Sequence, residues 1–339
     1  MSPRTLLRAA AAGALALLAA SCSPKEGGAK EAWGTTAKPI GFSILSAENQ
    51  QSMGSVWEPL LTDLTKETGL VVKPFFASNY SLLIEAMRAH RVQAGWFSAL
   101  SSLEAARRAD GQVIVRAANG QGGSYTSDLI VRRGSGITLD RVLKCDRSLN
   151  FGLGDAKSTS GTLAPLAYLF TPKGIDPATC FKQVRSASHE ANLLSVANGV
   201  LDVATNNSVG LIFARRSNPD VVAKVDTIWV SPPLPESAIV VRGGDLDEAT
   251  VRKLRDFFAG YGKAPGPDQA RRKHVLEVLT YSGFDLADNG YLLPVRIMEA
   301  SNALAQAKRG GDAGRVAEAQ TRYDALAGPT PPAVEKIGG

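Results

Sequence analysis

The sequence predicts an α/β protein built from two similar lobes. Apolar runs typical of buried strands alternate with segments of helical periodicity, which is the pattern of layered sheets and helices. This pattern begins at Pro39 and begins again near residue 149. A helix, a tight turn and a short strand follow Tyr80 and, at the same spacing, His189. The repeat is faint and chance is its alternative explanation, but two lobes with a ligand cleft between them would account for it.

The first half of the chain has a regular order of strands and helices. The apolar segment 39–45 is typical of a buried strand. Val56, Leu60 and Leu64 then recur at helical spacing, and Gly69 is expected to end that helix. Further elements follow in the order strand, helix, strand: 70–76, 81–90 and 92–97. Because helices separate the strands, we expect a mostly parallel sheet.

The second half repeats the order and completes the predicted domain organisation. Strands are expected over 149–152, 181–184, 201–205, 227–230 and 238–241, and helices over 191–198, 246–261 and most of 294–326. The predicted organisation is a first lobe of 38–132 plus 239–295, a second lobe of 133–238 and a C-terminal helical tail of 296–339.

The N-terminal segment is expected to be a secretion signal rather than part of the fold. Arg4 and Arg8 precede an apolar run, 9–20, that is too short to span a bilayer. Small residues lead to Cys22 in a sequence, LAASC, similar to a bacterial lipobox, although simple cleavage is the alternative. We therefore expect a lipoprotein signal peptide over 1–22, a lipid on Cys22 and a flexible tether over 23–37. The protein would then be periplasmic or at the cell surface, anchored to a membrane by its lipid.

Charge and cysteine content exclude several classes of function. The net charge is +6, but Lys and Arg do not cluster with aromatic residues, so no nucleic-acid partner is expected. Cys145 and Cys180 are an even pair in an exported chain, which favours a disulfide between them. Neither has a second Cys or His at ligand spacing. We expect no metal site and no cofactor.

The segment GDAKSTSG (154–161) is the sharpest local signal for binding. It joins a predicted strand to a helix, and the free N–H groups at a helix start attract anions. Ser158, Thr159 and Ser160 add three hydroxyl groups, whereas N-capping alone, the alternative, needs only one. The segment lacks the pattern of a dinucleotide-binding loop and of a P-loop. We expect an anion site here.

Two further side chains lie at strand-to-helix turns, where ligands gather in open α/β sheets. His189 follows small polar residues, and Tyr80 follows Ser78 and Asn79 at the corresponding turn of the first half. A structural His and a core Tyr are the alternative interpretations. Their shared position favours both as ligand-binding residues.

At these residues the chain resembles the PhnD-type periplasmic phosphonate-binding proteins of ABC importers. The resemblance rests on SAENQQ (46–51), FFASNY (75–80), RADGQV (108–113), GDAKSTSG (154–161) and SHEANLLSVANGVLDVATNN (188–207). It implies a type II periplasmic-binding-protein fold, a binding protein rather than an enzyme, and a permease as partner. It also implies that six side chains hold the oxyanion: Tyr80, Tyr125, Ser158, Thr159, Ser160 and His189. Without the resemblance, Tyr125 would be assigned to the core.

One departure from the family pattern concerns the ligand. Relatives that bind 2-aminoethylphosphonate clasp its ammonium group with two carboxylates, and Val209 and Ser237 stand at those positions here. Glu236 is adjacent, but neighbouring side chains on an extended segment point in opposite directions. Because burying an unpaired ammonium is costly, the sequence favours methylphosphonate, ethylphosphonate, phosphite or phosphate. A ligand-sensing lipoprotein and, less favoured, a phosphonate or phosphorus-ester hydrolase are the competing functions.

Overall fold

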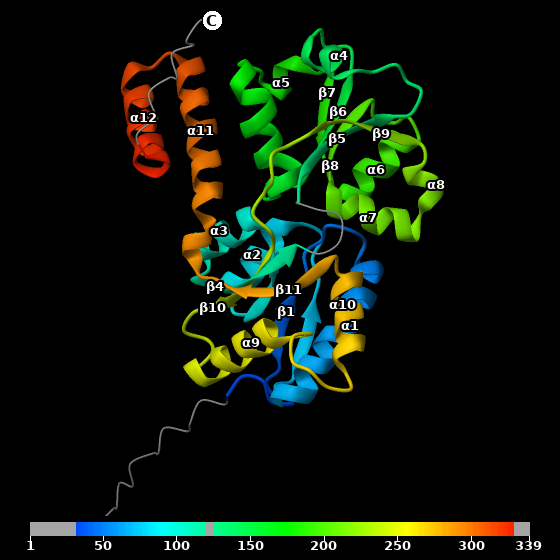
Figure 1. Cartoon of the computed structure of the whole chain (residues 1–339). Coiled ribbons are helices and arrows are strands. Elements are labelled where there is room, and N and C mark those ends of the chain that lie inside the picture. Colours follow the sequence, from blue (N-terminus) through cyan, green and yellow to red (C-terminus); the bar gives the residue numbers. More distant parts are fainter. Residues whose placement is uncertain (1–31, 120–124, 329–339) are drawn as a thin grey trace, which may run out of the picture. The chain divides into compact units, whose positions relative to one another are not determined.

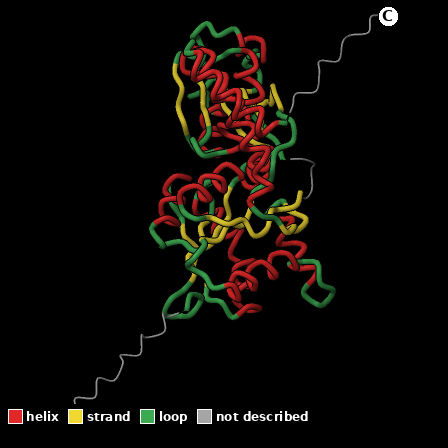
Figure 2. The backbone as a smooth tube through the Cα atoms, turned by 90° about the vertical axis from the view of Figure 1, so that its left-hand side faces the viewer, coloured by secondary structure: helices red, strands yellow, loops and turns green. Residues whose placement is uncertain are grey.

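A computed structural model describes residues 32–119 and 125–328. Its strands belong to two separate sheets, which form two separate groups of strands in Figure 2. Within these two ranges, no helix combines the length and the apolar character needed to cross a membrane. We call each sheet with its helices a lobe.

The first lobe, in which Figure 1 labels β1, β4, β10 and β11, has a six-stranded sheet in the order β11-β4-β10-β3-β1-β2. The strands are β1 (Ile40–Ser43), β2 (Val72–Phe75), β3 (Ala94–Phe97), β4 (Gly111–Asn119), β10 (Ala238–Arg242) and β11 (Tyr281–Leu286). The helices are α1 (Gln50–Thr68), α2 (Tyr80–Arg88), α3 (Ala99–Arg108), α9 (Glu248–Gly260), α10 (Gln269–Val278) and the short η4 (Asn289–Leu292). Phe42 of β1 packs against both Trp57 of α1 and Phe258 of α9, so these two helices cover the same face of the sheet.

The second lobe has a five-stranded sheet in the order β7-β6-β8-β5-β9. Its strands are β5 (Ser127–Arg132), β6 (Asn150–Leu153), β7 (Gln183–Ser186), β8 (Val203–Asn207) and β9 (Val225–Val230). Its helices are α4 (Leu139–Leu143), η1 (Thr159–Leu163), η2 (Leu166–Phe170), η3 (Thr171–Lys173), α5 (Pro177–Cys180), α6 (His189–Ala197), α7 (Ser208–Ser217) and α8 (Pro219–Val222). Stacked and edge-on rings of Phe151, Phe170 and Phe181 form the centre of one of its cores.

The sheets are mixed, and the expectation of a mostly parallel sheet is wrong. In the first lobe, β10 runs antiparallel between β3 and β4. In the second, β5 runs antiparallel between β8 and β9. Both β5 and β10 are the strands by which the chain enters a lobe from the other one. Neighbouring strands become parallel when a crossover helix connects them. A strand that enters its sheet from the opposite lobe is not connected in this way and can run antiparallel.

The passage of the chain from the first lobe to the second lies before β5, which corrects the predicted boundary between the lobes. Ser127–Arg132 was assigned to the first lobe, but β5 pairs with β8 and β9 and belongs to the second. Its apolar residues Leu129, Ile130 and Val131 are buried there. Local hydrophobicity identifies a buried strand but carries no information about which of two sheets receives it.

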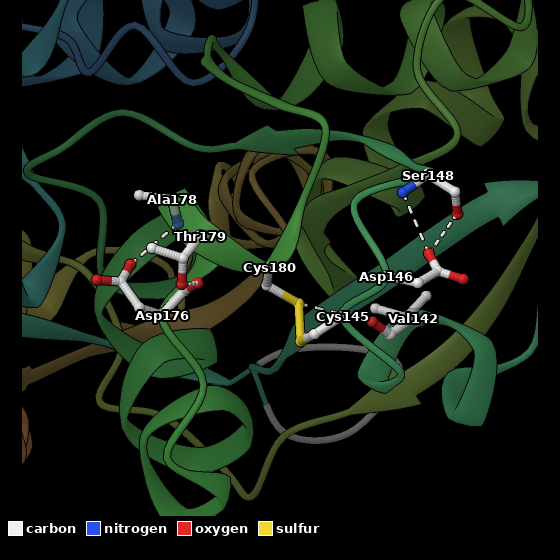
Figure 3. Close-up of a disulfide and its surroundings, with 8 residues drawn as sticks. All are labelled: Val142, Cys145, Asp146, Ser148, Asp176, Ala178, Thr179 and Cys180. Carbon is white, nitrogen blue, oxygen red and sulfur yellow. Dashed lines mark hydrogen bonds between the residues drawn. A yellow bond between two sulfur atoms is a disulfide. The ribbon is translucent and has the colours of Figure 1, made fainter.

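A disulfide joins Cys145 and Cys180 in the second lobe (Figure 3). Cys180 is buried and contributes to the same core as Phe181 and Phe151. The bridge links the loop that follows α4 to the end of α5, over a separation of 35 residues. It therefore ties two peripheral segments to one side of the second sheet.

The C-terminal tail consists of two helices, α11 (Leu293–Gly310) and α12 (Ala313–Ala327), that pack against each other. Helix α11 contacts both lobes. Its Glu299 forms an ion pair with Arg107 of α3, with 2.8 Å between the charged atoms. Its Asn302 accepts a hydrogen bond of 2.8 Å from the Thr171 hydroxyl group in the second lobe.

Candidate functional site

A cavity lined by residues of both lobes lies where the carboxyl ends of several strands meet. Its volume is about 30 Å³, so the side chains that line it stand close together in this structure. Tyr80, Trp96 and Ser98 line it from the first lobe, and His189 and Asn207 from the second. These residues begin helices or end strands, which is where α/β proteins collect binding groups.

The GDAKSTSG segment connects β6 to a helix that starts with a π-helical turn, η1. The N–H of Gly154 donates to the carbonyl oxygen of Gly161 at 2.8 Å and closes the loop. A Cβ atom added to Gly154 would lie 2.4 Å from the Cα atom of Gly161. Glycine is thus needed at positions 154 and 161 so that the loop can close on itself. π-helical turns are uncommon and concentrate at functional sites.

The three hydroxyl groups of this segment have three different partners. Ser158 is the N-cap, because its Oγ accepts a hydrogen bond of 2.9 Å from the N–H of Gly161. Thr159 Oγ1 accepts one of 2.8 Å from the N–H of Leu100, the second residue of α3 in the first lobe. Ser160 Oγ accepts one of 2.7 Å from the hydroxyl group of Tyr125. One hydroxyl group therefore caps, one joins the lobes and one faces the other predicted binding residues.

His189 is the first residue of α6 and is 3% exposed. Its Nε2 lies 3.4 Å from both Ser158 Oγ and Ser160 Oγ, longer than a normal hydrogen bond. Its Nδ1 has no hydrogen-bond partner within the described residues. Burial lowers the pKa of His189 to about 4, so the ring is neutral near pH 7 in this structure. The ring has capacity to bind a further polar group.

Tyr80 and Tyr125 line the same cavity as His189. Tyr80 is the first residue of α2, and its N–H donates to Asp155 Oδ2 of the second lobe at 3.1 Å. Burial raises the phenol pKa of Tyr80 and of Tyr125 well above the ordinary value. Both hydroxyl groups therefore keep their protons and can donate hydrogen bonds. Tyr80, Tyr125 and His189 line the cavity, whereas Ser158 and Ser160 do not line it but contact His189.

Val209, Glu236 and Ser237 also line the cavity. Both Glu236 and Ser237 line the cavity, and both are at least nine-tenths buried. Strand β10 begins only at Ala238, so the preceding segment is irregular and the alternation of a strand does not apply to it. Glu236 therefore adds a carboxyl group to a site that seemed to lack one.

Glu48 is a cavity residue that sequence reasoning missed. It lies in the loop between β1 and α1, one residue before Asn49, the N-cap of α1. Burial, and secondarily the charge of Glu190, raise the pKa of Glu48 to about 8. Burial likewise raises the pKa of Glu236 to about 7. The SAENQQ segment contains Glu48, but no local periodicity distinguishes a carboxyl group in a cavity from one on the surface.

Several polar contacts join the two lobes around the cavity. The Asn49 backbone N–H and side-chain amide both donate to the Glu190 carboxylate, at 2.8 and 3.0 Å. Lys157 Nζ lies 2.6 Å from Glu104 Oε2. With the Thr159–Leu100 hydrogen bond, these contacts hold the lobes in a closed arrangement.

The raised pKa of Glu48 leads to a prediction about stability and pH. A raised pKa means that the folded protein binds this proton more tightly than the unfolded chain does. Proton binding at Glu48 therefore stabilises the fold fully below about pH 4.5, the ordinary pKa, and this stabilisation is lost as pH rises through about 8, the pKa in the folded protein. Glu48→Gln cannot ionise. Without ligand, the free energy of unfolding of Glu48→Gln minus that of wild type is therefore expected to be roughly 1–2 kcal/mol larger at pH 9 than at pH 5. This figure is discounted because Glu48 is only partly buried.

Thermal melting of the two proteins at both pH values measures this difference. Glu58→Gln, which changes an exposed residue of α1, is the matched control and should show no such change. An equal difference between Glu48→Gln and wild type at pH 5 and pH 9 would contradict the assigned burial.

The described residues offer no group of three or more His, Cys, Asp or Glu side chains arranged to hold a metal ion. Within the same ranges, the polar groups that line the cavity are hydroxyl, imidazole, carboxyl, amide and indole groups.

Comparisons with known proteins identify the family. A family model described as "ABC transporter, phosphonate, periplasmic substrate-binding protein" matches residues 42–291. The phosphonates-binding periplasmic protein of Escherichia coli (strain K12) is 41% identical over 262 residues, which are 76% of this chain and 75% of that protein. A binding protein component of an ABC phosphonate transporter from Pseudomonas aeruginosa has a TM-score of 0.79 at 36% identity, covering 85% of this chain and 96% of that one.

The fold is also shared with PhnD1 from Prochlorococcus marinus, whose structure was solved in complex with methylphosphonate. The TM-score is 0.67 at 19% identity, over 76% of this chain and 96% of that chain. These similarities confirm the predicted α/β, two-lobed periplasmic-binding-protein fold and the family resemblance. The chain belongs to the periplasmic phosphonate-binding proteins of ABC transporters.

Proposed function

We propose that this protein captures a small phosphorus oxyanion, a phosphonate or phosphite, in the cavity between its lobes and delivers it to an ABC permease. The observation that carries the proposal is that Tyr80, Tyr125 and His189 line the cavity, while Ser160 Oγ contacts the Tyr125 hydroxyl group and lies 3.4 Å from His189 Nε2. The starts of two helices, η1 and α6, meet at the same place. Helix starts favour anions through their free N–H groups and their dipoles.

The separations between these groups suit an oxyanion placed among them. His189 Nε2 stands 3.4 Å from two serine hydroxyl groups, so neither pair forms a strong hydrogen bond. An oxygen of the ligand between them would take the donors that are poorly used in this structure. Tyr125 would turn its hydroxyl group from Ser160 to the ligand, and Tyr80 would donate from the opposite lobe. A buried anion needs this number of donors, because an unsatisfied buried charge is very costly.

Calorimetry tests the proposed ligand class. We expect the mature protein to bind methylphosphonate, phosphite or phosphate at one site per chain, and to bind sulfate much more weakly. Unlike sulfate at neutral pH, the phosphorus oxyanions can keep a proton with which they donate to an acceptor such as Glu236. Tight binding of sulfate without any binding of a phosphorus oxyanion would overturn the proposal.

Import rather than sensing is supported by the family, whose members are transporter components. A strain without this protein should fail to grow on a phosphonate as its sole phosphorus source, and the wild-type gene should restore growth only when the permease is intact. Normal growth of the deletion strain, with loss of a phosphonate-induced response, would favour the sensing function. Release of inorganic phosphate by the purified protein would instead favour a hydrolase.

The family places the protein in the periplasm, and we further propose a lipid anchor on Cys22. This residue and the tether lie outside the described residues, so the proposal rests on the LAASC sequence and the preceding apolar run. Cys22→Ala is expected to move the protein from the membrane fraction to the soluble fraction, because acyl chains are the membrane anchor of such a lipoprotein. Wild-type protein that is already soluble after cell fractionation would contradict the anchor.

A further inference from the structure

The start of helix α1 in the first lobe meets the start of helix α6 in the second. Asn49 immediately precedes α1, and Glu190 is the second residue of α6. The backbone N–H of Asn49 donates to Glu190 Oε2 at 2.8 Å, and its side-chain amide donates to both carboxylate oxygen atoms, at 3.0 and 3.2 Å. We call this pair of residues the latch. Its hydrogen bonds are charge-assisted, which makes them about twice as strong as neutral ones.

Asn49 also caps its own helix, so the latch and the cap share one side chain. Asn49 Oδ1 accepts a hydrogen bond of 2.9 Å from the N–H of Ser52. In a complete capping box, a Glu or Gln side chain at the position of Ser52 would bond back to the N–H of the capping residue. Serine stands there instead. Glu190 supplies a carboxylate to that N–H from the other lobe, so the start of α1 is complete only while the lobes are together.

The latch borders the proposed ligand cavity without lining it. Glu48 precedes Asn49 and His189 precedes Glu190 in the sequence, and Glu48 and His189 both line the cavity. The two latch residues line a separate hollow of about 480 Å³, which shares Leu45 and Glu48 with the cavity. Asn49 is exposed and Glu190 is half-buried. The latch therefore joins the two lobes beside the cavity, at a place that water reaches.

We infer that the latch sets the rate at which the protein releases its ligand, so that Asn49 and Glu190 are positioning residues that hold the lobes closed. The inference rests on the proposed function. Tyr80 and His189 of the proposed oxyanion site are each 3% exposed, so a ligand held between them leaves only when the lobes separate. Separation breaks the latch, because its two residues belong to different lobes. A weaker latch therefore raises the population of open protein and speeds release.

The latch can be altered without changing the oxyanion site, unlike several other contacts between the lobes. The contacts of Asp155, Lys157 and Thr159 with the first lobe come from the GDAKSTSG segment. A substitution there would disturb the hydroxyl groups that the proposed function uses. A change in ligand release caused by a latch variant instead reports on the closure of the lobes.

Rapid mixing with methylphosphonate tests the inference, with the fluorescence of Trp96, which lines the cavity, as the signal. Asn49→Asp keeps the helix cap, because aspartate caps as well as asparagine, but sets a second carboxylate against that of Glu190. We expect the dissociation rate constant to rise about tenfold or more and the association rate constant to change less than about threefold, because the repulsion acts on the closed state. Gln51→Glu, the matched control, adds the same charge at an exposed position in the first turn of α1 and should leave both rate constants within about twofold of wild type.

Glu190→Gln separates the latch from a long-range effect of charge on the anionic ligand. Removing a negative charge near an anion would by itself slow the release of that anion. The latch predicts the opposite, release about threefold faster or more, because glutamine carries no charge and offers Asn49 one acceptor oxygen atom in place of two. The double variant Asn49→Asp/Glu190→Gln has the net charge of wild type. Its new amide can donate to its new carboxylate, so its release rate is expected to be within about threefold of wild type.

The other outcomes separate this inference from the proposed function, and melting curves establish that every variant is folded. Release of methylphosphonate at the wild-type rate from both single variants would overturn the inference alone. A double variant that releases the ligand as fast as Asn49→Asp would also overturn it, because the defect would then lie in the start of α1 and not in the pairing. Slower release from Glu190→Gln would show a long-range effect of charge in place of a latch. If neither methylphosphonate nor phosphite binds wild type, the proposed function fails and the inference fails with it.

Discussion

Replacing Ser160 with alanine is expected to weaken phosphonate binding by about 1.5–3 kcal/mol, roughly a factor of 10 to 150. Ser160 Oγ stands between the Tyr125 hydroxyl group and His189 Nε2, so its loss removes one donor and disturbs the position of two others. Thermal stability without ligand should fall little, because the helix start is capped by Ser158 and not by Ser160. Calorimetric titration of both proteins with the same phosphonate measures the effect.

Two further variants make this result specific to the oxyanion site. Ser217→Ala changes an exposed hydroxyl group on α7 and should leave the affinity at the wild-type value. Ser158→Ala should lower stability by about 1 kcal/mol, as expected for the loss of an N-cap. Unchanged affinity of Ser160→Ala together with a lower melting temperature would mean that Ser160 is structural, and the proposed site would be wrong.

Replacement of both Cys145 and Cys180 with serine is expected to lower the free energy of unfolding by about 3–4 kcal/mol. The bridge closes a loop of 35 residues, and the cost follows from the greater conformational freedom of the unfolded chain without it. Denaturant unfolding of the natively exported protein, with and without the substitutions, measures the difference. Ligand affinity should not change, because neither cysteine lines the cavity.

The matched control is wild type unfolded in the presence of reductant, which should approach the double variant. Two free thiols in the exported protein, or equal stability of the two forms, would contradict a structural disulfide. A loss of affinity in the double variant at temperatures where it stays folded would show that the bridge also acts on the cavity.

Hydrophobic periodicity was sufficient to locate many elements of the fold. The predicted strand 39–45 contains β1, and the predicted helix 246–261 contains α9. Helix α3 was missed because alanines, serines and arginines in ALSSLEAARR leave only a short apolar period. The antiparallel direction of β5 and β10 could not be predicted from the sequence, because it depends on how the chain passes between the lobes and not on any local pattern.

Only the part of the candidate site that depends on local sequence could be predicted. Helix starts are local features, so the positions of Ser158–Ser160 and of His189 as binding candidates could be derived from short segments. The division of roles among the three hydroxyl groups could not, because Thr159 meets Leu100 only when the two lobes come together. Glu48 was missed for the same cause: its burial arises from residues of both lobes that surround the loop after β1.

The structure of the complex with a phosphonate tests the central claim most directly. The account predicts that the phosphorus atom lies in the cavity between the lobes. Its oxygen atoms should be within hydrogen-bonding distance of Ser160 Oγ, His189 Nε2 and the hydroxyl groups of Tyr80 and Tyr125. A phosphonate bound elsewhere on the protein, or bound in this cavity with its oxygen atoms turned away from these four groups, would contradict it.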